Sequence, residues 1–214
     1  MPDISLIDPR LLQTKSSEMI ASTGMDTLTH AIEAYVSSLS WHLTDPHACH
    51  AIKLVFRHLK EAVYKKTLDP LEGMAVASLE AGAAFSNAIL GAVHALAHPL
   101  GGHYDMHHGL ANAMLLPVVL KKNLEHAPEK YALIANAMGI DTRNKTHAEA
   151  AEQVPEQIEA LIKALHIPSK LSQVGVRKED IPGLARNAAE DLCMMTNPQR
   201  YGVAEIETMY QQAL

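Results

Sequence analysis

Five histidines fall within the stretch from Gly91 to Pro117, which reads GAVHALAHPLGGHYDMHHGLANAMLLP. They are His94, His98, His103, His107 and His108. Far upstream, Asp26 and His30 stand four residues apart in GMDTLTHAIEAY, a spacing that places two side chains on one face of a helix. Imidazoles and a carboxylate on two separate segments are what a protein needs to hold one borderline divalent metal. The sequence therefore predicts a metal site with catalytic chemistry.

The spacing of the histidines in the second segment indicates which of them can lie near His94. His94 and His98 are one helical turn apart. His108 follows His94 by fourteen residues, and the Gly101-Gly102 pair between them lets the chain fold back. One carboxylate with three imidazoles suits Fe²⁺, Zn²⁺, Mn²⁺, Co²⁺ or Ni²⁺. Fewer than six protein ligands would leave room for a substrate oxygen.

The ordinary alternative is that a histidine on a helix is a surface or core residue. We read His103 and His107 as loop residues. The remaining histidines are interpreted as surface or core residues: His42, His47, His50, His58, His126, His147 and His166. The sequence has no HExxH motif and no His-Asp dipeptide, so the common metalloprotease and phosphohydrolase patterns do not apply.

Composition excludes several classes of function. The formal charge is −6 and no Lys/Arg run is long enough for a phosphate-binding stripe, so we expect no nucleic-acid partner. Cys49 and Cys193 are far apart and form no CxxC pair, which excludes a thiolate zinc site and fits a reducing compartment. We find no long uncharged apolar stretch and no signal-peptide pattern. We therefore expect a cytoplasmic protein that does not enter a membrane.

The elements that must position the histidines read as helices almost throughout. Aromatic residues make up only 4% of the chain, so the core must be built from Ala, Leu, Ile, Val and Met, which favours close helix packing. Asp45-Pro46 and Asp69-Pro70 look like helix starts, Gly91 suggests close contact or a break, and Gly101-Gly102 is expected to end a helix. The predicted helices span 17–38, 46–65, 70–98, about 108 onward with a kink at Pro117, 127–138, 146–166 with an interruption at Pro155, 178–193 and 204–213.

A nucleotide-binding domain is not apparent. A βαβ dinucleotide fold needs hydrophobic strands alternating with helices and a glycine-rich first turn. The chain contains no G-x-G triplet. One all-α domain over residues 1–214 is the simplest prediction.

Three segments resemble the iron-containing (group III) alcohol dehydrogenase family. GMDTLTHAIEAY is similar to its first metal motif, and HALAHPLGGHYDMHHGLANAMLLP is similar to its second. The tail from Asp191 to Pro198, DLCMMTNP, resembles the C-terminal signature of the family. This resemblance implies four metal ligands: Asp26, His30, His94 and His108. The residue before the last ligand is commonly proline in the family and is His107 here.

The same resemblance implies roles for residues around the metal. His98 corresponds to the histidine near the substrate that takes part in proton relay. Phe85 and Cys193 fall where the family lines its substrate pocket. Asn112 follows the last ligand in a G-x-x-N-A arrangement and reads as a structural residue.

By resemblance, the chain is the helical C-terminal, metal-binding domain of the dehydroquinate synthase-like and iron-containing alcohol dehydrogenase fold, without the α/β nucleotide-binding domain. The implied reaction converts an alcohol to an aldehyde or ketone, with hydride transfer to NAD or NADP held by the missing domain. Fe²⁺ is the expected metal, with Zn²⁺ or another divalent ion as the alternative. Family members are often dimers or larger, so a homo-oligomer or a nucleotide-binding partner domain is expected.

Two other functions are weighed against this one. A non-catalytic, metal-binding helical module could pair with a separate nucleotide-binding chain, since the bared surface would invite association. A lyase of the dehydroquinate synthase type would share the fold and a similar metal. The complete set of one aspartate and three histidines favours the dehydrogenase.

Overall fold

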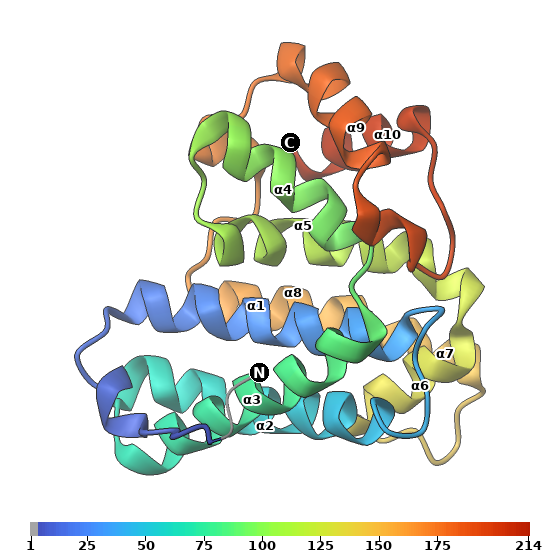
Figure 1. Cartoon of the computed structure of the whole chain (residues 1–214). Coiled ribbons are helices and arrows are strands. Elements are labelled where there is room, and N and C mark those ends of the chain that lie inside the picture. The colour runs from blue at the N-terminus through green and yellow to red at the C-terminus, as the bar shows by residue number, and fades with distance from the viewer. Residues whose placement is uncertain (1–3) are drawn as a thin grey trace.

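Helices form the whole framework of the computed structural model, which describes residues 4–214 (Figure 1). Within those residues there is no β-strand, which confirms the all-α prediction. The α-helices are α1 (Ser17–Val36), α2 (Asp45–Lys65), α3 (Leu68–Ala88), α4 (Ala92–Tyr104), α5 (His108–Asn123), α6 (Pro128–Ala137), α7 (His147–Ala151), α8 (Gln153–Ala164), α9 (Ile181–Ala189) and α10 (Val203–Ala213). Short 3-10 turns connect them: η1 (Pro9–Leu12), η2 (Leu124–His126), η3 (Leu171–Val174), η4 (Lys178–Asp180) and η5 (Leu192–Met195).

Helix α1 is the central element of the fold. It packs on α2 and α3 on one side and on α5 on the other, as Figure 1 shows. Ser16 caps its N-terminus by accepting a hydrogen bond from the backbone N–H of Met19. A Cβ added at Gly24 would lie 2.2 Å from Leu59 Cδ1, so this glycine lets α1 and α2 approach closely. A helix buried on both sides is a rigid support for the side chains it carries.

The predicted helix 70–98 is two helices, because the chain breaks between α3 and α4. Ile89 has a positive φ of 62°, and the two helices are bent by 102°. The structure shows both features considered for Gly91, the helix break and a close contact with other segments. A Cβ added there would lie 2.8 Å from Asn197 Oδ1 and 2.9 Å from Glu33 Oε1. The bend therefore presses the start of α4 against the polar side chains of two other segments.

The predicted helix end at Gly101-Gly102 is wrong. Helix α4 runs through both glycines to Tyr104, and the chain leaves it at Asp105, whose φ is 51°. A glycine inside a helix costs only about 1 kcal/mol, which packing can outweigh. Leu100 is fully buried beside the pair, and α4 packs on α5 and α9.

Two more predicted helices differ from the structure, whereas the helix predicted from about 108 matches the start of α5 and 204–213 matches α10 closely. The span 146–166 divides at Glu152, and Pro155 lies in the first turn of α8, where a missing N–H costs little. The span 178–193 holds a shorter helix flanked by η4 and η5. Helix α5 continues past Pro117 to Asn123.

The core is rich in alanine and aliphatic residues, as the composition predicts. Among the described residues, no single helix is long and apolar enough to cross a bilayer. Helices α3 and α4 pass that test of length and composition only as a bent pair.

Candidate metal centre

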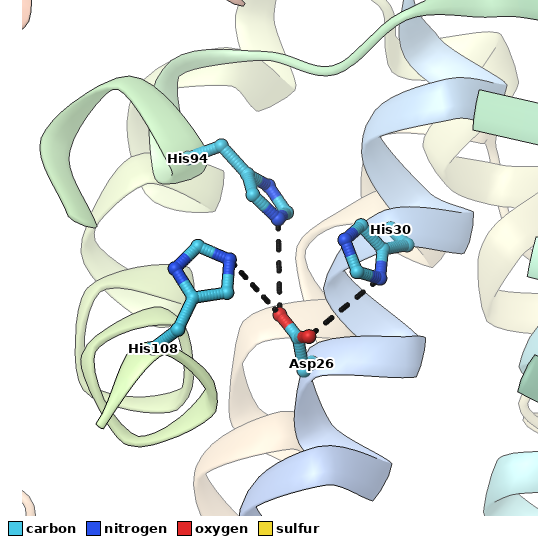
Figure 2. A group of neighbouring side chains, drawn as sticks. All are labelled: Asp26, His30, His94 and His108. Atoms are coloured by element: carbon cyan, nitrogen blue, oxygen red, sulfur yellow. Dashed lines mark ion pairs between the residues drawn. The ribbon is translucent and has the colours of Figure 1, made fainter. Parts of the chain in front are cut away.

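Asp26, His30, His94 and His108 converge on one point from three helices, as Figure 2 shows. Helix α1 supplies the first two, α4 supplies His94 and α5 supplies His108. One potential ligand atom from each residue lies within 4.8 Å of all the others. The sequence had placed these residues on two segments, and the helix packing brings the segments together.

The distances within this group are those of atoms arranged around a shared cation. Asp26 Oδ1 lies 3.7 Å from His94 Nε2 and 3.6 Å from His108 Nε2, and Asp26 Oδ2 lies 3.8 Å from His30 Nδ1. These separations are too long for hydrogen bonds. Two atoms that each bind one ion at about 2.1 Å lie roughly 3 to 4 Å apart. The donor set and its spacing therefore fit a divalent transition metal.

Burial keeps two of the imidazoles in the form that binds metal. It lowers the pKa of His30 to about 4, although the neighbouring Asp26 acts in the opposite direction. Burial also lowers the pKa of His108, again against Asp26. A neutral imidazole offers a lone pair to a metal, whereas a protonated one does not.

The low pKa of His30 predicts that the metal-free chain loses stability in acid. The unfolded imidazole titrates near its ordinary pKa of 6.5, whereas the folded one titrates near 4. The folded state therefore binds fewer protons between these values, and stability falls as the pH drops from 6.5 towards 4. At pH 5 His30 contributes a loss of about 2 kcal/mol at most. Urea unfolding in EDTA at pH 7.5 and 5.0 measures it, and His30→Gln should show a smaller difference between the two pH values than the wild type.

Asn112 lies among the four residues of this group. Its Nδ2 donates to Asp26 Oδ1 at 2.6 Å and lies 3.1 Å from Nε2 of both His94 and His108. Its Oδ1 is buried and has no hydrogen-bond partner among the described residues. An unpartnered buried amide oxygen is costly, because burial removes it from water without supplying a hydrogen bond.

Glu33 is the functional residue that the sequence reasoning did not single out. It is 2% exposed, and its Oε2 lies 2.6 Å from His94 Nδ1. Its Oε1 accepts from the backbone N–H of Val93 at 2.6 Å, in the first turn of α4. A carboxylate accepts only, so Nδ1 of His94 must carry the proton and Nε2 is left to face Asp26. The available signal was its position, three residues after His30 on the same helix face.

The other predicted site residues lie next to this group. His98 stacks on His108, with ring centroids 5.5 Å apart, and Phe85 stacks on His30 at 4.5 Å. Cys193 belongs to a second group with His98 and Asp191. Burial raises the pKa of the Cys193 thiol to about 12, so the thiol is protonated at neutral pH.

Both His103 and His107 were predicted to be loop residues, and the structure agrees for only one of them. His103 is in the last turn of α4, which corrects that prediction, because the helix continues through the glycine pair. Its Nε2 lies 3.7 Å from Asp180 Oδ2. His107 precedes α5, as predicted, and is not in the four-residue group.

Gly109 sets the distance between α5 and α1, and hence between His108 and Asp26. A Cβ added at Gly109 would lie 2.4 Å from the backbone oxygen of Ser22, which cannot move without α1. Gly109→Ala should therefore lower the free energy of unfolding by about 1–3 kcal/mol and weaken metal binding. Gly82→Ala is the matched control, because nothing lies within 4 Å of its added Cβ. We expect it to stabilise α3 by about 0.5–1 kcal/mol. Equal unfolding midpoints for the two variants would contradict this explanation.

Comparison with known proteins identifies the family. Residues 20–214 match the C-terminal part of the Fe-containing alcohol dehydrogenase family. The chain belongs to this family. The 1,3-propanediol dehydrogenase of Citrobacter freundii is 45% identical over 214 residues, which is 100% of this chain and 55% of the relative. The lactaldehyde reductase of Escherichia coli (strain K12) is 40% identical over 213 residues, or 100% of this chain and 56% of the relative.

Solved structures of the iron-containing alcohol dehydrogenase family agree with the fold. A crystal structure of 1,3-propanediol oxidoreductase matches with a TM-score of 0.98 at 44% identity, over 100% of this chain and 56% of that one. An alcohol dehydrogenase from Oenococcus oeni matches with a TM-score of 0.94 at 37% identity, over 97% and 54%. This confirms the predicted C-terminal domain fold, and the chain spans about half the length of the relatives it matches.

Proposed function

We propose that this chain is the metal-binding catalytic half of a nicotinamide-dependent alcohol dehydrogenase. The observation that carries the proposal is the convergence of one carboxylate and three imidazoles on one point, in a chain that belongs to the iron-containing alcohol dehydrogenase family. The curated relatives include enzymes named for 1,3-propanediol, lactaldehyde and methanol. We therefore propose small alcohols and their aldehydes as substrates.

Asp26, His30, His94 and His108 are the residues that would hold the metal, with Fe²⁺ as the proposed ion. When bound, such an ion supplies Lewis-acid polarisation of a substrate oxygen. The four residues include no thiolate, so the site is borderline in character and also accepts Zn²⁺. Glu33 keeps His94 in the tautomer that such binding requires.

The remaining residues of the site bind the substrate and move its proton. His98 is 44% exposed beside the ligand group, so its imidazole is accessible to a bound alcohol and is our proposed proton acceptor. Phe85 offers an apolar ring next to His30, which excludes water and favours a short carbon chain. Cys193 adds a protonated thiol to the same region.

The proposed cofactor is NAD or NADP, and we expect it to be bound mainly by the part of the family members that residues 1–214 do not cover. The names of two relatives give both cofactors: an NAD-dependent methanol dehydrogenase and an NADPH-dependent butanol dehydrogenase. A fluorescence titration of NADH into the iron-loaded chain tests how much of the cofactor site lies here. Saturable binding would locate a usable site on the chain, and no binding would assign the site to the other half.

The activity itself is tested by joining the chain to the N-terminal half of the Citrobacter freundii relative. The fusion is loaded with Fe²⁺, and absorbance of NADH and NADPH is followed with a panel of short primary alcohols and aldehydes. We expect metal-dependent turnover that EDTA abolishes. The relative rebuilt from its own two halves by the same junction is the control. Turnover by that control but not by the fusion would contradict the proposed function.

Assembly and the non-catalytic alternative are tested together. We propose that the chain associates, either with a second copy or with a nucleotide-binding partner, in the cytoplasm. Light scattering of the purified chain measures this directly, and a strictly monomeric species would count against association. The lyase alternative has no support among the relatives named above, which are dehydrogenases and reductases.

A further inference from the structure

We propose that Asp191 is a positioning residue that holds His98 in its Nδ1-protonated tautomer, so that Nε2 is the nitrogen that exchanges the substrate proton. This inference rests on the proposed function for its purpose, since it concerns the proton acceptor of that reaction. It concerns a residue 93 positions away in the sequence, between α9 and η5, to which no role has been assigned above.

Both carboxylate oxygens of Asp191 are engaged. Oδ2 lies 2.7 Å from Nδ1 of His98, and Oδ1 accepts from the backbone N–H of Cys193 at 2.8 Å. The second bond caps η5 and fixes the direction of the carboxylate. The backbone N–H of Cys193 therefore orients the carboxylate of Asp191 independently of its contact with His98.

Asp191 is ionised at neutral pH and can only accept hydrogen bonds. Burial, the largest single influence, would raise the pKa of Asp191, but the hydrogen bonds from His98 and Cys193 together lower it below the ordinary value. An acceptor at 2.7 Å requires a proton on Nδ1 of His98. A neutral imidazole carries one proton, so Nε2 then has a free lone pair.

His98 is placed where such a lone pair is useful. It follows His94 by one turn of α4, and its ring stacks on that of His108 with an interplanar angle of 15°. Among the described residues, no side chain or backbone group hydrogen-bonds to its Nε2. One edge of the ring is thus fixed by protein, and the other edge is open to a ligand beside the metal-binding group.

The group of His98, Asp191 and Cys193 is better described as a hydrogen-bonded pair with a neighbouring thiol than as a second metal site. The separation of 2.7 Å between His98 Nδ1 and Asp191 Oδ2 is that of a charge-assisted hydrogen bond and is shorter than two ligands of one ion require. The Cys193 thiol, with its pKa near 12, is not a ready anionic ligand.

The proton transfer needs no reactant besides the alcohol, His98 and the nicotinamide ring. During alcohol oxidation, the O–H bond of the substrate breaks and an N–H bond forms at His98 Nε2, while the hydride leaves the carbinol carbon for the nicotinamide ring. The imidazole becomes an imidazolium ion, and Asp191 remains ionised and stabilises it. In aldehyde reduction the same proton returns to the substrate oxygen.

The tautomer can be measured on the 214-residue chain by ¹⁵N NMR of the histidine side chains, in its metal-free and Zn²⁺-loaded forms. His98→Ala assigns the resonances. In the wild type we expect a protonated Nδ1 and an unprotonated Nε2 at His98. In Asp191→Asn, the remaining oxygen stays on the Cys193 N–H and the amide NH₂ faces His98, so the unprotonated resonance should move from Nε2 to Nδ1.

Asp180→Asn is the matched control, because Asp180 is near a different histidine, His103. It should leave the His98 resonances unchanged. Urea unfolding of the variants separates positioning from folding: we expect Asp191→Asn to keep the wild-type midpoint while it reverses the tautomer. An Nε2-protonated His98 in the wild type, or an unchanged tautomer in Asp191→Asn, would overturn the proposal. This readout needs no turnover, so failure of the proposed activity would appear separately, in the fusion assay.

Discussion

Replacing Asp26 or His94 by alanine is expected to abolish stoichiometric metal binding. Each substitution removes one of four donors whose atoms lie within 4.8 Å of one another. Removing a residue that only supports a ligand costs about 10- to 100-fold in affinity, so removing a ligand itself should cost more than about 100-fold. Metal content after iron or zinc loading and desalting, measured by mass spectrometry, gives the result, and calorimetric titration with Zn²⁺ gives the affinity.

His103→Ala is the control for this prediction. His103 is on the same helix as His94, but it lies outside the four-residue group. The His103→Ala variant should retain one metal per chain. Because His94 is only 1% exposed, its alanine variant leaves a cavity, and circular dichroism must show that the variant is folded. Asp26→Asn changes less volume and tests the same ligand. Full metal content in folded Asp26 and His94 variants would contradict the ligand assignment.

Glu33→Ala is expected to have the largest effect on stability. The substitution leaves the N–H groups of Val93 and His94 buried without their partner at 2.6 Å. Each unpaired buried donor costs about 1–3 kcal/mol, so we expect a total loss of about 3–5 kcal/mol. Urea unfolding of the metal-free chain measures this loss. Glu72→Ala, at an exposed position of α3, is the control and should change stability by less than about 0.5 kcal/mol.

Glu33→Gln separates stability from metal binding. The glutamine keeps the volume and can still accept from Val93, but it then presents an NH₂ group to His94 Nδ1 and disfavours the tautomer that leaves Nε2 free. We expect a fall in Zn²⁺ affinity of about 10- to 100-fold with a smaller loss of stability than in Glu33→Ala. Unchanged affinity in a folded Glu33→Gln variant would show that Glu33 acts on the fold alone.

The convergence of Asp26, His30, His94 and His108 was predictable partly from local spacing and partly from the family motifs. Asp26 and His30 share a face of any helix that contains them, and the resemblance to the family motifs selected His94 and His108 from five neighbouring histidines. The predicted return of the chain before His108 is correct, but the turn is at Asp105 and not at the glycine pair. Buried Leu100 and the packing of α4 outweighed the weak helix propensity of two glycines.

The residues that support the site were not predictable in the same way. In the sequence, Glu33 is an ordinary acidic residue of a helix. Its contacts with α4 depend on the bend before that helix, which requires the positive φ of Ile89 and the lack of a side chain at Gly91. Asp191 meets His98 across 93 residues, and no periodicity connects them. Contacts between segments distant in sequence come from tertiary packing, which a single sequence does not encode in its local pattern.

The proposed function depends most on one divalent metal bound by the four converging residues. Anomalous diffraction at the iron edge, from crystals of the iron-loaded chain, tests this directly. We expect one strong anomalous peak within bonding distance of Asp26, His30, His94 and His108. A peak at His98, Asp191 and Cys193 instead, or no peak in a chain that contains stoichiometric iron in solution, would contradict it.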